Sequence, residues 1–150
     1  MIDATLRVRP RTMEPKPPNV LIAYDGSEPS RRALNRVRTF IPNASDAVIS
    51  VAAPVYRNPT LPQFADEDEE QRQKESLAEA QARLAESGFD ARTTAPVGDA
   101  AAEIVRVADE SGADLIVLGA RGLNPVKRLV LGSVSTKVLH QATCDVLVVK

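Results

Sequence analysis

The sequence predicts an α/β fold in which a five-stranded parallel sheet, in the strand order 3-2-1-4-5, has helices on both faces. Short apolar runs alternate with longer segments of helical periodicity, in the order β-α-β-α-β-α-β-α-β, which is typical of such folds. The best of these runs are continuously apolar, as expected for strands buried on both faces. The length of 150 residues suits one domain with a single core.

The chain begins with residues 1–18, a segment rich in proline and arginine without sustained periodicity, which we expect to form a flexible arm before a domain at residues 19–150. The first strand is expected at Val20–Tyr24, ending at Asp25-Gly26-Ser27. Ser27 can cap the helix that follows, because its hydroxyl can accept from a free backbone N–H, and Pro29 suits the first turn. The apolar face of that helix comprises Ala33, Leu34, Val37 and Ile41.

The second strand is expected at 47–53, followed by a proline-rich connection at 54–65. The acidic run at 66–70 opens a long helix to about Ser87, because acids favour the positive end of the helix dipole, and Gly88 closes it. The remaining elements are a less apolar strand at 91–97 nearer a sheet edge, a helix ending at Gly112, the strongest strand signal at 114–119, a helix at 133–141 and a last strand at 145–149.

In the order 3-2-1-4-5 the chain reverses direction between the first and fourth strands. Open parallel sheets bind ligands at such a reversal, beyond the carboxyl ends of the strands. Asp25, after strand one, and Gly119, after strand four, would lie there. Composition alone does not select this order, but the position of the motif described below supports it.

Composition excludes several classes of protein. The 19 basic and 20 acidic residues give a net charge of −1, which argues against a dedicated nucleic-acid binder. No run approaches the roughly 20 apolar residues of a membrane helix, and no secretory signal is evident, so we expect a cytoplasmic protein without a membrane partner. A single histidine, His140, and a single cysteine, Cys144, do not suffice for the usual zinc clusters. We expect His140 at the surface or a helix end and Cys144 as a small core residue.

The distinctive segment of the chain is 119–135, which begins at the end of the best strand and finishes in a helix. Gly119 and Gly122 permit unusual dihedrals and let a ligand approach the backbone. Gly132 and Ser133 place free N–H groups at a helix N-terminus, where the dipole contributes about half a positive charge. Positive charge and further hydroxyls come from Arg121, Lys127, Arg128 and Ser135. This combination predicts a phosphate cradle.

The same residues have a plainer interpretation as ordinary turn and capping chemistry. One such turn would mean little, but two turns linked by a basic loop at the carboxyl edge of a parallel sheet favour a ligand site. Neither the G-x-x-x-x-G-K-[ST] phosphate loop nor the dinucleotide G-x-G-x-x-G pattern is present.

The pattern resembles the ATP-binding motif of the universal stress protein family, which is Gly-x-x-Gly, nine residues, then Gly-Ser. Gly119, Gly122, Gly132 and Ser133 match this motif without a gap. The segments Tyr24-Asp25-Gly26-Ser27-Glu28-Pro29-Ser30, Asp114-Leu115-Ile116-Val117-Leu118-Gly119, Leu131-Gly132-Ser133-Val134-Ser135 and Cys144-Asp145-Val146-Leu147-Val148-Val149 are also similar to the family, so the resemblance covers about residues 19–150.

This resemblance implies a Rossmann-like fold of the adenine-nucleotide α-hydrolase-like class. Its implied ligand is ATP, with AMP or cyclic AMP as alternatives and Mg²⁺ able to accompany ATP. Asp25 would meet the ribose or adenine, and Val51 would contact adenine through its backbone and side chain. Gly119, Arg121 and Gly122 would lie along the ribose and phosphates. The residues implied to hold the phosphates are Gly132, Ser133, Val134 and Ser135.

The resemblance further implies a nucleotide-responsive regulator in stress response, acting on a protein partner that the sequence does not identify. Asp25 is the one candidate general base, and its place at the ribose end suits it poorly to that role, so at most weak ATP hydrolysis is expected. The alternatives are a slow ATPase or adenylyl-transfer enzyme, and an interaction module that binds AMP, cyclic AMP or no nucleotide. A homodimer through the last strand, Val146–Val149, is also expected, because an open apolar edge invites pairing.

Overall fold

The computed structural model describes residues 16–43, 47–54, 63–121 and 131–150, and its centre is a five-stranded sheet in which every neighbouring pair is parallel. The strand order is β3-β2-β1-β4-β5, so the predicted fold class and strand order are confirmed. The strands are β1 (Asn19–Ala23), β2 (Val48–Ala52), β3 (Arg92–Thr94), β4 (Leu115–Gly119) and β5 (Asp145–Val149).

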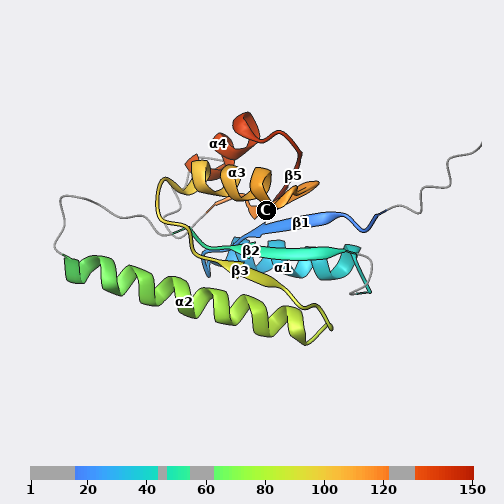
Figure 1. Ribbon diagram of the computed structural model, residues 1–150, viewed down its shortest axis with the longest axis horizontal. Helices are drawn as coiled ribbons and strands as arrows, with labels where there is room; N and C mark the ends of the chain where they lie inside the picture. Colours follow the sequence, from blue (N-terminus) through green and yellow to red (C-terminus); the bar gives the residue numbers. More distant parts are fainter. Residues whose placement is uncertain (1–15, 44–46, 55–62, 122–130) are drawn as a thin grey trace, which may run out of the picture.

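Helices cover both faces of the sheet (Figure 1). One face packs against α1 (Glu28–Phe40) and α2 (Gln63–Ala85), and the opposite face packs against α3 (Ala100–Ser111) and α4 (Ser133–Gln141). The alternation of side chains along each strand produces the two cores. In β1, Val20 and Ile22 belong to the core under α1 and α2, whereas Leu21 and Ala23 belong to the core under α3 and α4. Strands buried on both faces explain the continuous apolar runs.

Two elements, α2 and β3, differ from the sequence prediction by more than one residue at a boundary. Helix α2 begins at Gln63, three residues before the predicted acidic start, and ends at Ala85. Strand β3 has only three residues, although seven were predicted, because it pairs with β2 alone at three positions and forms the edge of the sheet. The predicted edge position of this strand is therefore confirmed, whereas its predicted length is wrong.

The termini of the helices agree well with the capping predictions. The hydroxyl of Ser27 accepts from the Ser30 N–H at 3.3 Å and caps α1, and Pro29 lies in the first turn. Helix α4 begins and ends as predicted, with an exposed His140 in its last turn. Three predicted segments fall partly outside the described residues: the arm up to residue 15, the connection at 55–62 and the loop at 122–130.

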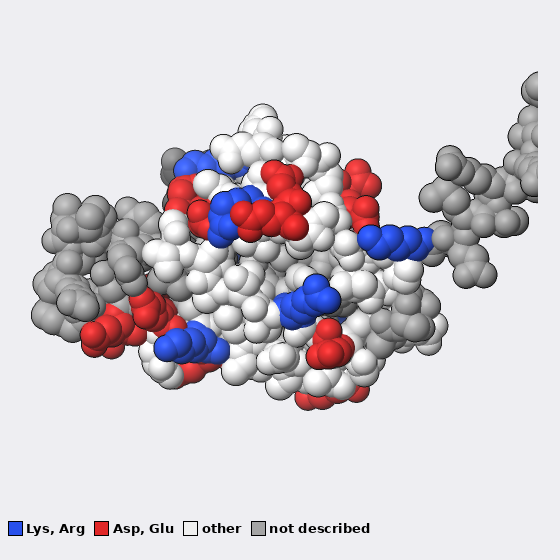
Figure 2. Space-filling view, in the orientation of Figure 1, with Lys and Arg blue, Asp and Glu red and all other residues white. Residues whose placement is uncertain are grey.

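The charged side chains on the face drawn in Figure 2 are of both signs. On α3, Arg106 pairs with Glu103 and with Glu110, each at 2.7 Å, and acidic side chains gather at the N-terminal end of α2. None of the described helices combines the length and the apolar character that a membrane span requires.

Candidate functional site

The carboxyl ends of β1, β2 and β4 lie side by side at one edge of the sheet, because the strands are parallel and adjacent. This edge receives Asp25 after β1, Ala53 after β2 and Gly119 at the end of β4. The N-terminus of α4 returns to the same edge, since the Gly132 N–H donates to the Ala120 carbonyl oxygen at 2.6 Å. The structure thus brings together the segments that the sequence singled out.

The turn after β1 is held by the side chain of Asp25. One carboxylate oxygen of the half-buried Asp25 accepts from the Ser27 N–H at 3.0 Å, and Gly26 between them has a φ of 77°. A non-glycine residue rarely adopts that conformation, so the glycine fixes this turn. The second oxygen of Asp25 has no hydrogen bond to a described residue and lies at the edge where a ligand would bind.

Gly119 has a packing role that corrects our expectation. We expected an unusual backbone conformation there, but among the described residues positive φ values occur only at Gly26, Gly88, Gly98 and Gly112. A Cβ at residue 119 would lie 2.7 Å from the Pro29 carbonyl carbon and 2.9 Å from the Ser30 nitrogen. Glycine is therefore required because the end of β4 touches the start of α1.

The two ends of the loop between β4 and α4 meet at the Ala120 carbonyl. That oxygen accepts from the Gly132 N–H and from the Ser135 hydroxyl, the latter at 3.0 Å. Ser135 is buried and its hydroxyl lies within hydrogen-bond distance of two carbonyl oxygens, that of Ala120 and that of Gly132 at 3.1 Å, so its proton has acceptors inside the protein and our expectation that it binds phosphate is corrected. The backbone N–H of Ser135 remains available.

The N-terminus of α4 differs from those of α1 and α3. Ser27 caps α1 and Asp99 caps α3, whose Ala102 N–H donates to the Asp99 carboxylate at 3.1 Å. Helix α4 starts at Ser133 after the N-cap residue Gly132, which has no capping side chain, and the first intrahelical bond runs from the Thr136 N–H to the Gly132 carbonyl. The backbone N–H groups of residues 133–135 consequently have no acceptor among the described residues. Unpaired donors at the positive end of a helix form an anion-binding arrangement.

Arg121 adds positive charge beside these donors. It follows Ala120 directly, is half-buried, and makes no hydrogen bond or ion pair with any described residue. The exposed Ser133 hydroxyl lies on the same helix terminus, and the half-buried Val134 follows it. The other loop residues that the sequence selected, Gly122, Lys127 and Arg128, lie outside the described residues.

Val51 does not present its side chain to this edge. It is completely buried, in the core under α1 and α2, so the structure corrects the expected side-chain contact with adenine. The alternation along β2 explains this burial, because Val51 faces α1 and α2 while Ala52 faces the opposite core. At the end of β2 the Ala52 carbonyl accepts from the Tyr24 N–H at 2.9 Å and the Ala53 N–H donates to the Thr94 carbonyl at 3.0 Å.

A polar network between α1 and α2 was missed by the sequence analysis. Arg31 donates to both carboxylate oxygens of Glu79, at 2.9 and 3.2 Å, and Arg83 donates to one of them at 2.9 Å. These hydrogen bonds, Arg31 first, lower the pKa of Glu79 below its ordinary 4.5. Burial, and then the charge of Glu79, raise the pKa of the adjacent Tyr24. The four-residue spacing of Glu79 and Arg83 signals one pair, whereas nothing in the sequence signals Arg31.

Cys144 behaves as the sequence predicted. It packs at the margin of the core under α3 and α4, and burial raises the pKa of its thiol. A raised pKa disfavours the reactive thiolate at neutral pH.

Comparison with known proteins identifies the family. The model of the universal stress protein family matches residues 18–150. The chain belongs to the universal stress protein family. Universal stress protein YxiE of Bacillus subtilis is 33% identical over 144 residues, and the match covers 87% of this chain and 97% of YxiE.

Solved structures share the fold of this chain. A universal stress protein crystallised in complex with cAMP is 30% identical, has a TM-score of 0.69, and the match covers 89% of this chain and 97% of that one. Protein MJ0577 is 25% identical, has a TM-score of 0.75, and the match covers 90% of this chain and 96% of that one.

The predicted site residues of this universal stress protein therefore fall into two groups. Asp25, Arg121 and the α4 N-terminus from Ser133 place polar groups at the carboxyl edge that lack full partners among the described residues. Val51 and Gly119, and the hydroxyl of Ser135, serve packing or loop closure.

Proposed function

We propose that this universal stress protein binds an adenine nucleotide, ATP in the first place, along the carboxyl edge of its sheet. The uncapped N-terminus of α4 is the observation that supports this most strongly. Its N–H groups at residues 133–135 have no partner among the described residues, and phosphate oxygens are the acceptors that such donors favour. The relative in complex with cAMP adds support, because it shares both family and fold.

The phosphates bind at α4, held by the backbone N–H groups of Ser133, Val134 and Ser135 and by the hydroxyl of Ser133. Gly132 contributes an unobstructed approach and no donor, because its own N–H already donates to the Ala120 carbonyl. The guanidinium of Arg121, which has no partner among the described residues, adds the positive charge that the dipole of α4 alone does not supply. Mg²⁺ accompanies ATP at these phosphates. Gly119 makes room for the start of α1, and Gly122, which lies outside the described residues, is the glycine proposed to leave the path of the nucleotide free. The ribose and base extend toward β1 and β2. There the second oxygen of Asp25, which has no partner among the described residues, suits a ribose hydroxyl, and the backbone near Val51 lies beside the adenine.

Binding regulates this protein rather than driving rapid catalysis. Asp25 lies at the ribose end and already accepts from the Ser27 N–H, so it is poorly placed to activate a water at the γ-phosphate. Cyclic AMP is the second candidate ligand, favoured by the cAMP complex of a relative. The protein acts in the cytoplasm as a homodimer joined through β5, whose outer edge has no partner strand in the described sheet.

The test uses proline to remove one N–H donor without harming the helix. Ser133 is the first residue of α4, a position where proline is favoured, and Gly132 before it is extended at φ −78° and ψ 168°, which suits a following proline. Ser133→Pro should therefore lower ATP affinity about tenfold to a hundredfold, because it removes one charge-assisted hydrogen bond, while thermal stability holds. Isothermal titration calorimetry beside thermal melts measures both quantities.

Ser133→Ala is the matched control, since it removes the hydroxyl and keeps the N–H. It should cost less affinity than Ser133→Pro. If folded Ser133→Pro binds ATP as the wild type does, the α4 cradle is not the site. ATP turnover at roughly 1 per second or faster would replace the regulator with the enzyme alternative.

A further inference from the structure

Helix α2 has a glutamine at a position where its pattern calls for an apolar residue. Its core-facing stripe comprises Leu77, Ala80 and Leu84, at helical spacing, and these pack in the core under α1 and α2. Four residues before Leu77 the same stripe is occupied by Gln73, which is only 6% exposed. A long polar side chain is thus buried on the inner face of the helix.

The amide of Gln73 is only half satisfied. Its nitrogen donates to a carboxylate oxygen of Glu69 at 2.8 Å, and because a carboxylate only accepts, this bond identifies which end is nitrogen. Its oxygen is fully buried and has no hydrogen-bond partner among the residues that the structure describes. Buried acceptors are almost always paired in folded proteins, so an unpaired one calls for an explanation.

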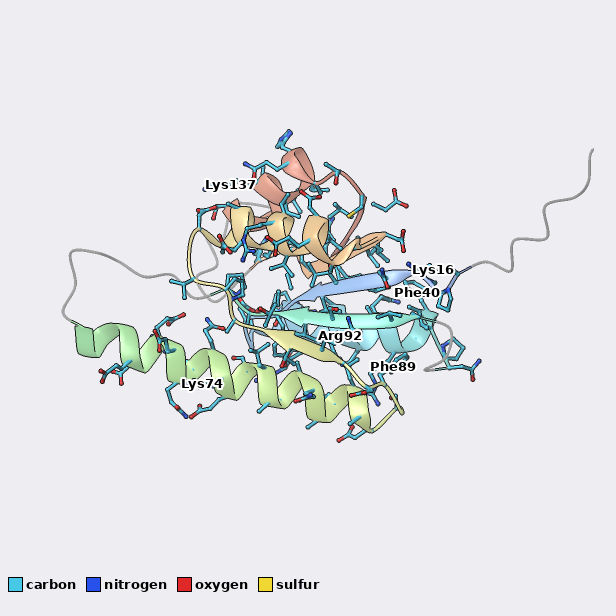
Figure 3. The ribbon with its side chains drawn as sticks, in the orientation of Figure 1. Lys16, Phe40, Lys74, Phe89, Arg92 and Lys137 are labelled. Atoms are coloured by element: carbon cyan, nitrogen blue, oxygen red, sulfur yellow. The ribbon has the colours of Figure 1, made fainter. Side chains whose placement is uncertain are left out.

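Two contacts of neighbouring α2 residues indicate that Gln73 lies level with the carboxyl edge of the sheet. Gln81 donates to the carbonyl of Ala91, which lies just before the start of β3. Gln73 precedes Gln81 by eight residues on α2, a rise of about 12 Å, which is roughly the length of β3. The Ser76 hydroxyl lies 2.9 Å from where a Cβ of Gly26 would be, so the next turn of α2 passes beyond the β1 loop. Figure 1 shows α2 extending past the strand ends, and Figure 3 marks the level of Gln73 through its neighbour Lys74.

We propose that the side-chain oxygen of Gln73 accepts a hydrogen bond from the exocyclic amino group of the bound adenine, and so selects adenine over 6-oxopurines. The inference rests on the proposed function. With the phosphates at α4, the base lies at the other end of the edge, beside β2 and the passing turn of α2. Adenine offers an N–H₂ donor at carbon 6, whereas hypoxanthine and guanine offer an acceptor that would oppose the Gln73 oxygen.

Comparing ATP with inosine triphosphate tests this contact, because carbon 6 carries an amino group in one and an oxygen in the other. N1 also changes, from an acceptor to an N–H donor, so the Gln73 variants are needed to assign the difference to the side-chain oxygen. Wild-type protein should bind ATP about tenfold or more tightly than inosine triphosphate, since the wrong base leaves two acceptors facing each other. Gln73→Leu and the similarly shaped Gln73→Met should bring the two affinities within about twofold, with undiminished melting temperatures, because an unpaired buried oxygen is removed. Gln71→Leu, on the exposed side of α2, is the matched control and should keep the wild-type ratio.

The outcomes separate this inference from the proposed function. If the wild type binds neither ATP nor cyclic AMP, both ideas fail together. If the wild type prefers ATP and the folded Gln73 variants keep that preference, nucleotide binding stands and the role of Gln73 is wrong. An equal loss of both triphosphates in those variants also overturns the role, because the oxygen would then not distinguish the bases.

Discussion

The glycines of the Gly-x-x-Gly, nine residues, Gly-Ser motif have different physical roles in the structure. Gly119 avoids a collision between β4 and the start of α1, whereas Gly132 leaves a helix start uncapped. Spacing along the chain could not distinguish these roles, because the contact of Gly119 with Pro29 joins segments far apart in sequence. The apolar run of the second strand already indicated that the Val51 side chain is buried and does not contact adenine, because a strand covered on both faces buries its side chains.

The two glycines should respond differently to alanine. Gly119→Ala places a Cβ 2.7 Å from backbone atoms of Pro29 that cannot yield easily, so the free energy of unfolding should fall by about 1–3 kcal/mol. Gly132→Ala meets its nearest atom, the Ala120 oxygen, at 3.3 Å and should cost about 1 kcal/mol or less. Urea denaturation measures both changes. Equal losses at the two positions would show that β4 and α1 separate readily.

Among the elements, the sequence predicted best where local chemistry decides. The start of α1 follows from Ser27 and Pro29, and the start of α4 follows from Gly132 and Ser133, because caps and turns act over a few residues. The start of α2 and the length of β3 could not be predicted as well. The boundary of α2 has no capping signal at Gln63, and β3 is limited by its single neighbour, β2. The join between α1 and α2 through Arg31 and Glu79 depends on packing that no local pattern reveals.

The contact between Arg31 and Glu79 makes the free energy of unfolding depend on pH in a definite direction. Because the pKa of Glu79 is lowered in the folded protein, its contribution to stability is complete above 4.5, its ordinary value, and is lost as the pH falls through the lower folded value. Chemical denaturation of wild type and Glu79→Gln should therefore show a constant stability difference from pH 7 to about pH 5.5, shrinking below pH 4.5. The control is Glu86→Gln, since Glu86 is 69% exposed and 3.9 Å from Arg38. A difference unchanged down to pH 3 would show that Glu79 acts only through packing.

At the scale of the whole molecule, the sheet order leaves β5 at an edge, and the hydrogen-bond pattern shows which of its groups face outward. The Ala120 N–H donates to the carbonyl of Val149, so Val149 faces β4. Backbone groups alternate sides along a parallel strand, and Val146 and Val148 therefore direct their N–H and C=O groups away from β4. A second copy can pair with these groups across a twofold axis without disturbing the sheet.

Proline at an outward-facing position tests this assembly while sparing the bonds between β4 and β5. Val148→Pro removes an N–H that the sheet does not use, so the chain should still fold and bind nucleotide, but the antiparallel pairing of two β5 strands should be lost. Light scattering at micromolar concentration should give the mass of a dimer for the wild type and that of one 16.2 kDa chain for Val148→Pro. The control Val148→Ala keeps the N–H and should also give the mass of a dimer. A wild-type monomer would contradict the β5 interface, and so would a folded Val148→Pro dimer, because the outward N–H groups would then have no part in holding the two copies together.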